Sequence, residues 1–340
     1  MMSYYGLIIA AITCGLCMDH LLAQDTALTN ATQDGSLGRF RAQDTLVLRE
    51  DPRADATDCL AGLRWQPTDF EVHVEPDKAT DRILKVRFAS PRPSGVSLAD
   101  RVAVEWHPAK DAQSGAILKR PAVIVVHESG SSMNVGRLIA SDLGRRGIHA
   151  FMVQLPGYGD RKANDFRPDD LVGVFKQGVA DVRRARDAVA AIPQVDSRHI
   201  GLQGTSLGGF VASLSGSLDG SFDSVFLLLC GGNLHGVLTS GSKDARKALE
   251  RLIASGVAAN EVHQALQAVE PLRIAHRLDA QKTWLYTGTF DDVVPPKYSK
   301  ELAEAIDLPR ERHVQMLATH YSGVIFLPGV LEKIVQVVEQ

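Results

Sequence analysis

Residues 199–210 read HIGLQGTSLGGF, an apolar strand-like run that passes through glycines into an apolar helix-like run. They contain the pattern G-x-S-x-G, in which Ser206 lies between Gly204 and Gly208. Glycine at both positions lets the chain turn sharply without Cβ clashes, so the Ser206 hydroxyl projects above the end of a strand. There it can meet a base, while the N–H of Leu207 points at a developing oxyanion. The pattern therefore predicts a serine nucleophile.

Two other interpretations of this turn are open. Ser206 can act only as the cap of a helix that follows a tight β–α turn. Alternatively, the glycines can form a phosphate-binding loop, but that motif ends in a lysine and none follows here. The strand before the motif and the helix after it favour the nucleophile.

The surrounding sequence repeats the same alternation. Continuous apolar runs, which are typical of strands buried on both faces of a parallel sheet, occur at 122–127, 150–156, 224–231, 283–288 and 313–318. Segments with helical periodicity lie between them. Three earlier runs, between about residues 68 and 108, alternate apolar with polar residues and predict antiparallel strands. Together these patterns predict an α/β fold with a doubly wound, mostly parallel sheet.

The composition is that of an ordinary globular protein. Hydrophobic residues make up 45% of the 340 residues and charged residues 23%, which excludes disorder throughout, collagen and a disulfide scaffold. The formal net charge is -3 and aromatic residues make up 6%, so neither electrostatics nor base stacking favours a nucleic-acid partner. Of the classes of protein considered, an enzyme or a protein that binds small molecules remains.

The N-terminus predicts export. Residues 6–18 form an apolar run that is too short to cross a bilayer, which needs about 20 residues. The run matches the apolar part of a secretory signal peptide, and Ala23 is a small residue suited to the position before the cut. We therefore predict a signal peptide over 1–23 and a secreted or periplasmic protein with no stable membrane insertion after cleavage.

The rest of the chain divides by composition. Residues 24–58 lack a sustained apolar period, which predicts a flexible mature N-terminus before a folded domain at 59–340. The interval from about 233 to 281 is too long for a simple crossover and contains two helical patterns. We expect a helical insertion there, with Leu252 and Leu266 shaping a substrate pocket; an enlarged crossover without ligand contact is the alternative.

The four cysteines suggest little redox chemistry. Cys14 and Cys17 lie within the apolar leader, and the residues before them fit a lipid-attachment site poorly. Export would leave Cys59 and Cys230, which can pair in an oxidising compartment. Cys230 ends an apolar run, however, and is more consistent with a small packed side chain.

A serine nucleophile needs a base, and the base needs an acid that orients it. In an open α/β sheet such sites lie at the carboxyl ends of the strands. His320 follows an apolar run, whereas His313 begins that same run at the opposite end. Asp291 follows another run, and the adjacent Asp292 is expected to face solvent or cap a helix. The sequence therefore predicts Ser206 as nucleophile, His320 as base and Asp291 as acid.

With its order Ser206, Asp291, His320, the chain resembles the α/β-hydrolase superfamily over about residues 68–340. The sequences GTFDDVVPP and ATH are similar to the acid and histidine loops of that superfamily. The His-Glu pair after an early strand and the G-x-x-L-G-G at the turn are nearest to the dienelactone hydrolase-like branch. That branch usually has cysteine where this chain has Ser206, so its substrate does not carry over.

The resemblance implies a second oxyanion donor after the strand that ends in His127. Here the loop continues Glu128-Ser129, where many members have His-Gly, so the N–H groups of Ser129 and Glu128 are both candidates and Ser129 is favoured. Glu128 can also pair with Arg161, or be a solvated loop charge. The pattern H-E-x-x-H of a zinc site is not completed, because Ser131 stands at the second histidine position.

These features predict a serine esterase. The substrate is a small carboxylic ester, the reaction passes through an acyl-enzyme, and no metal or organic cofactor is implied. A prolyl-oligopeptidase-like serine peptidase is the enzymatic alternative, although the N-terminal segment is too short for the propeller that such enzymes carry. A non-catalytic binding protein on the same fold is the other alternative. The oligomeric state is not indicated by the sequence.

Overall fold

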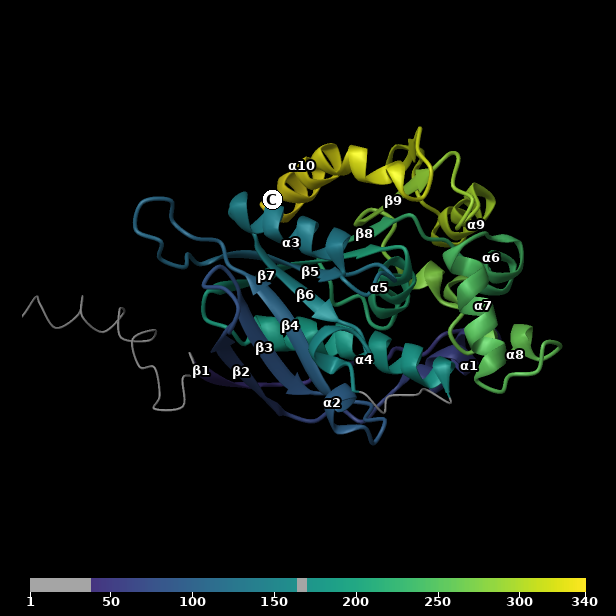
Figure 1. Cartoon of the computed structure of the whole chain (residues 1–340), viewed down its shortest axis with the longest axis horizontal. Coiled ribbons are helices and arrows are strands. Elements are labelled where there is room, and N and C mark those ends of the chain that lie inside the picture. The colour runs from purple at the N-terminus through teal and green to yellow at the C-terminus, as the bar shows by residue number, and fades with distance from the viewer. Residues whose placement is uncertain (1–37, 164–169) are drawn as a thin grey trace, which may run out of the picture.

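The computed structural model describes residues 38–163 and 170–340, which form one ten-stranded sheet (Figure 1). The strand order is β1-β2-β3-β4-β6-β5-β7-β8-β9-β10. Strands from β1 to β4 pair antiparallel, β4 is antiparallel to β6, and the strands from β6 to β10 are parallel. The bounds are β1 Gly38–Ala42, β2 Phe70–Pro76, β3 Leu84–Ala89, β4 Arg101–His107, β5 Arg120–Val126, β6 His149–Gln154, β7 Val195–Thr205, β8 Ser224–Leu228, β9 Thr283–Gly288 and β10 His313–Met316. The predicted α/β sheet with an antiparallel start is therefore confirmed.

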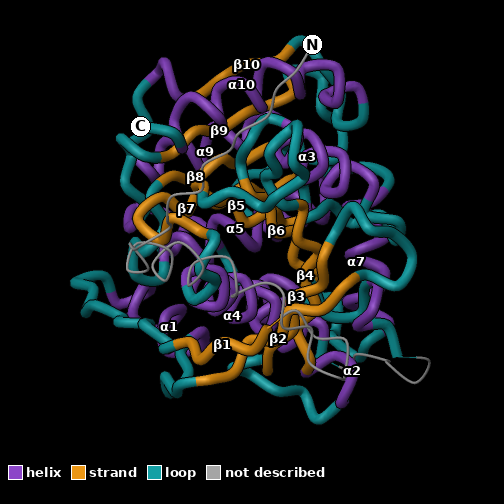
Figure 2. The backbone as a smooth tube through the Cα atoms, turned by 90° about the vertical axis from the view of Figure 1, so that its left-hand side faces the viewer, coloured by secondary structure: helices purple, strands orange, loops and turns teal. Residues whose placement is uncertain are grey.

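Helices cover both faces of the sheet, and Figure 2 shows the strands as one twisted layer from β10 to β1. Strands β6 and β8 are buried at every position, as expected for strands with apolar side chains on both faces. The helices of eight or more residues are α1 Ala54–Leu63, α3 Asn134–Arg145, α4 Leu171–Ala190, α5 Leu207–Ser217, α7 Asp244–Ala254, α9 Pro296–Ile306 and α10 Leu327–Val338. The shorter ones are α2 Ser97–Asp100, α6 Leu234–Ser240 and α8 Val262–Gln267.

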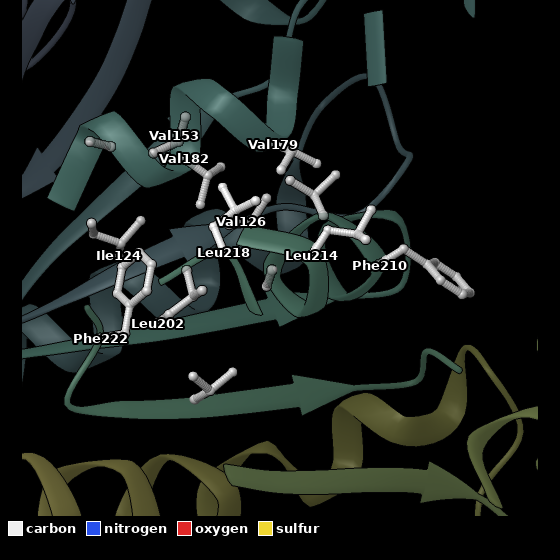
Figure 3. Close-up of a cluster of buried hydrophobic side chains, with 14 of the residues drawn as sticks. Ile124, Val126, Val153, Val179, Val182, Leu202, Phe210, Leu214, Leu218 and Phe222 are labelled. Atoms are coloured by element: carbon white, nitrogen blue, oxygen red, sulfur yellow. The ribbon is translucent and has the colours of Figure 1, made fainter. Parts of the chain in front are cut away.

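The sheet separates two hydrophobic cores. On one face, β5 and β7 pack against α4 and α5 through the side chains drawn in Figure 3, among them Ile124, Val182, Leu202 and Leu214. On the other face, α3 and α10 cover the sheet. This arrangement leaves the loops after β5, β7, β9 and β10 at the carboxyl edge, because these strands are parallel.

Residues 38–58 correct the prediction of a flexible segment over 24–58. They contain β1, which pairs with β2, and the first half of α1. The stretch between them is held by a buried ion pair, in which Arg184 Nη2 of α4 lies 2.6 Å from Asp44 Oδ2. A polar anchor of this kind leaves no apolar period in the sequence, which is why the segment looked unstructured.

Two further expectations have clear outcomes. Helices α6, α7 and α8 occupy the interval between β8 and β9, where the insertion was expected. Cys59 and Cys230 are both buried free thiols, so the disulfide between them is not formed. Burial raises the pKa of the Cys59 thiol to about 11 and that of Cys230 further still, so neither is a ready thiolate.

The signal peptide predicted over 1–23 lies outside the described residues. Within the described ones, no helix combines the length and the apolar character that crossing a membrane would need.

Candidate active site

Ser206 stands on a strained turn between β7 and α5. Its backbone has φ 53° and ψ −116°, a conformation that L-residues rarely adopt. A Cβ at Gly204 would lie 2.2 Å from Gly208 O, and one at Gly208 would lie 2.2 Å from Val126 O. Both contacts are with backbone atoms, so only glycine fits at either position. The Ser206 N–H donates to Leu228 O (2.8 Å), which ties the turn to the end of β8.

His320 reaches Ser206 from the loop that follows β10. Its Nε2 lies 2.9 Å from Ser206 Oγ, and its Nδ1 lies 2.7 Å from Asp291 Oδ2. All three side chains are buried. The loops after β9 and β10 are also joined directly, because the Phe290 N–H donates to Ala318 O (3.0 Å). The structure thus brings the three predicted residues into one hydrogen-bonded series at the carboxyl edge of the sheet.

The contacts of Asp291 fix the proton on the His320 ring. Its Oδ1 accepts the N–H groups of Val293 (2.9 Å) and Val294 (2.8 Å), while its Oδ2 faces His320 Nδ1. A carboxylate can only accept at neutral pH, so Nδ1 carries the proton and Nε2 is left to accept one from the Ser206 hydroxyl. This is the tautomer that a general base for serine requires.

Asp292 occupies a different environment. Its side chain is 50% exposed, against 1% for Asp291. It accepts from Ser242 Oγ (2.8 Å) and lies 3.2 Å from Lys243 Nζ. These hydrogen bonds, from Ser242 first and Lys243 second, lower the pKa of the Asp292 carboxyl. Asp292 therefore faces solvent and the insertion rather than His320.

The two amides expected to bind an oxyanion belong to segments that touch. Leu207 is the first residue of α5, where an N–H has no acceptor within its own helix. Beneath it, Gly208 packs on the carbonyl groups of Val126 and His127, which brings the loop after β5 against the start of α5. Ser129 lies in that loop, two residues past His127, and is partly exposed.

Comparison with solved structures identifies the architecture. Acetyl xylan esterase 1 from Thermoanaerobacterium sp. JW/SL YS485 superimposes with a TM-score of 0.62 and 16% identity, over 87% of this chain and 96% of the esterase. An acetyl xylan esterase from Paenibacillus sp. R4 gives 0.60 and 15%, over 85% and 96%. The chain has the α/β-hydrolase fold. A puromycin-hydrolyzing peptidase from Mycobacterium tuberculosis gives 0.55 and 18%, over 79% of this chain but only 46% of the peptidase. No family model and no curated protein matches the sequence.

Within this α/β-hydrolase fold, Glu128 caps a helix. Its Oε1 accepts the N–H of Val135 and its Oε2 that of Gly136, each at 3.0 Å, so it satisfies two of the free amides at the start of α3. Arg161 is fully buried and its guanidinium lies 2.6 Å from Asp181 Oδ2. The pair suggested between Glu128 and Arg161 is therefore wrong, because each has a nearer partner.

The end of the loop between α6 and α7 and the first residue of α7 contact Tyr321, the residue after His320, a contact that the sequence did not reveal. Asp244 Oδ2 accepts from Tyr321 Oη (3.0 Å), and Lys243 Nζ lies 5.0 Å from the centre of the Tyr321 ring. That ring meets His320 edge-on, with 5.5 Å between centroids. Desolvation and the Asp244 hydrogen bond raise the pKa of Tyr321 to about 12, so its phenol stays a donor at neutral pH.

The two leucines of the insertion that were expected to shape a substrate pocket are both buried. Leu252 and Leu266 lie in the hydrophobic core, at 3% and 7% exposure, which favours a packing role over their expected place in a substrate pocket. Within residues 38–163 and 170–340, no three His, Cys, Asp or Glu side chains are grouped in a way that could hold a metal ion.

Proposed function

We propose that this chain is a serine hydrolase that cleaves small carboxylic esters. The observation that carries the proposal is the series of two hydrogen bonds, from Ser206 Oγ to His320 Nε2 (2.9 Å) and from His320 Nδ1 to Asp291 Oδ2 (2.7 Å). A buried carboxylate, an imidazole and a serine at these distances are the parts that activate a hydroxyl for attack on an acyl carbon.

The reaction proceeds through an acyl-enzyme. His320 takes the Ser206 proton as Oγ bonds to the acyl carbon, and Asp291 stabilises the imidazolium. The negative oxygen of the tetrahedral intermediate accepts from the N–H groups of Leu207 and Ser129. The alcohol leaves with the proton from His320. Water, deprotonated by His320, then attacks the acyl carbon. The bond between this carbon and Ser206 Oγ breaks, Oγ takes the proton back from His320, and the carboxylic acid is released.

The share of each similar structure that this chain covers favours an ester substrate over a peptide. This chain spans 96% of each acetyl xylan esterase, but 46% of the puromycin-hydrolyzing peptidase. A short acyl group is the first to test, since two of the structures that align over nearly their full length are acetyl xylan esterases by name.

A hydrolysis screen and active-site labelling test the proposal. Purified protein is offered aryl esters of graded acyl length, sugar acetates and dipeptide amides, and its labelling by a fluorophosphonate is followed by mass spectrometry. Ser206→Ala should lower kcat by roughly 10⁴- to 10⁶-fold and abolish labelling while the fold is retained. If the dipeptide amides are cleaved faster than the esters, the protein is a peptidase and not an esterase. If the unaltered protein is not labelled, the hydrolase proposal is refuted and the alternative of a non-catalytic binding protein is supported.

We also propose that the protein is exported, on the strength of the apolar run at 6–18 followed by Ala23. N-terminal sequencing of protein from the periplasm or medium should begin near Gln24. Recovery of cytosolic protein that still carries Met1 would contradict export.

A further inference from the structure

The peptide groups on both sides of Ser129 are held by two side chains, those of His127 and Tyr158. The Glu128 carbonyl oxygen lies 2.6 Å from His127 Nδ1. The Ser129 carbonyl oxygen accepts from Tyr158 Oη at 3.2 Å. Because a peptide group is planar, holding the Glu128 carbonyl also fixes the direction of the Ser129 N–H, which lies on the opposite side of the same plane.

The His127 ring is set to donate to Glu128. Its Nε2 accepts the N–H of Leu155 (3.1 Å), so in the neutral ring the proton is on Nδ1, the atom that faces the Glu128 carbonyl. The ring is fully buried, and this burial lowers its pKa, which keeps it neutral. Tyr158 also packs on the ring, with 4.6 Å between centroids.

The segment is anchored on its other side as well. The Glu128 carboxylate is bound to two amides at the start of α3, as described above. A Cβ at Gly136 would lie 2.7 Å from His127 Cβ, so α3 contacts His127 directly. Rotation of the peptide group between Glu128 and Ser129 would therefore break the hydrogen bond between His127 Nδ1 and the Glu128 carbonyl, while Tyr158 and the start of α3 hold the groups on either side of it.

We propose that His127 and Tyr158 are positioning residues that aim the Ser129 N–H at the reacting oxygen. Among the described residues, neither side chain hydrogen-bonds to Ser206, His320 or Asp291. An oxyanion donor is effective only when it is held in place before the reaction, because a donor that must reorient spends part of its interaction energy on doing so. The inference rests on the proposed hydrolase function and assigns a role to two residues that the proposal leaves unused.

Two substitutions of His127 distinguish a role in orienting the Ser129 N–H from a role in packing alone. His127→Asn keeps an amide donor near the position of Nδ1, beside the Glu128 carbonyl, whereas His127→Gln keeps a polar group near Nε2, beside Leu155. Loss of one oxyanion donor costs about 10²- to 10³-fold in kcat, so a misdirected donor should cost roughly 10- to 100-fold. We expect that loss for His127→Gln, with KM nearly unchanged, and a smaller loss for His127→Asn. Tyr158→Phe, which removes only the hydroxyl, should lower kcat in the same way.

His149 provides the matched control. It is also a fully buried histidine with a ring nitrogen that accepts a backbone N–H, from Ala109 at 2.9 Å, but it starts β6 at the opposite edge of the sheet. His149→Gln should lower the melting temperature without changing kcat. The variants are compared by kcat, KM, the rate of fluorophosphonate labelling and the pH midpoint of kcat/KM, which should not move because the contacts of His320 are unchanged.

The outcomes are distinct. Unaltered protein that hydrolyses no ester and takes no label refutes the hydrolase and the positioning role together. Normal activity in the unaltered protein, with His127→Gln, His127→Asn and His149→Gln all losing kcat only in proportion to stability, refutes the positioning role alone.

Discussion

Replacing Asp291 with asparagine tests which ring nitrogen of His320 carries the proton. Asp291 Oδ1 accepts two N–H groups, from Val293 and Val294. An asparagine must keep its oxygen there, since its NH₂ group would otherwise face two donors. The NH₂ then points at His320 Nδ1, which can accept only when the proton has moved to Nε2. In that tautomer the ring can no longer take the Ser206 proton.

The size of the loss follows from the same contacts. Turning the amide over would restore the productive tautomer but leave two buried N–H groups unpaired, at about 1–3 kcal/mol each. The sum of roughly 2–6 kcal/mol corresponds to a ~30- to ~10⁴-fold reduction of the productive form. The same change in the serine protease triad costs about 10⁴ in kcat. We therefore expect Asp291→Asn to lose at least about 10²-fold in kcat.

Asp292→Asn is the matched control one residue away. Its carboxylate is half exposed and its partner is Lys243, and an exposed pair of this kind contributes at most about 1 kcal/mol. Its kcat should stay within about tenfold of the unaltered protein, because the His320 tautomer is untouched. Both variants are assayed on an aryl ester at neutral pH, with circular dichroism melts to confirm equal folding. The reverse ranking would refute the assignment of the acid and the tautomer reasoning with it.

Three further substitutions probe the surroundings of the site. Gly208→Ala places a Cβ 2.2 Å from Val126 O, so urea unfolding should show a loss at or beyond the roughly 1–3 kcal/mol typical of overpacking. Leu252→Ala should lower the free energy of unfolding in urea by about 2–5 kcal/mol and leave the order of preference among ester chain lengths unchanged. A changed order would show that Leu252 shapes the substrate pocket. Tyr321→Phe removes the hydrogen bond to Asp244, worth about 1 kcal/mol, so limited proteolysis between α6 and α7 should become roughly fivefold faster; an unchanged rate would show that this contact does not hold the loop.

The sequence predicted the sheet and the serine turn because both leave local signals. A strand buried on two faces is apolar at every position, as in β8, and a turn with backbone atoms pressed against it requires glycine at Gly204 and Gly208. Position at the end of a strand was then enough to select His320 and Asp291 from the other histidines and carboxylates. Each of these inferences used only neighbouring residues.

Two of the errors concern pairings between distant parts of the chain. Asp44 lies 140 residues from Arg184, yet the contact between them orders a segment whose composition suggests flexibility. Several acidic residues lie near Arg161 in the sequence. Asp181 is its partner because α4 packs beside Arg161 in the folded chain. The positions of charged residues in a sequence do not show which of them will form ion pairs, so these contacts are known only from the folded structure.

The insertion illustrates the same difference within the site. The apolar stripe of α7 marks Leu252 clearly in the sequence, and a stripe of this kind is the signature of packing against a core. The residues that reach the histidine loop, Lys243 and Asp244, precede the stripe and have no pattern of their own. Their contacts with Tyr321, one residue from His320, join the insertion to the rim of the site. Substrate selection by the insertion is therefore expected to depend on Lys243 and Asp244, and the stability of the insertion on the apolar faces of its helices.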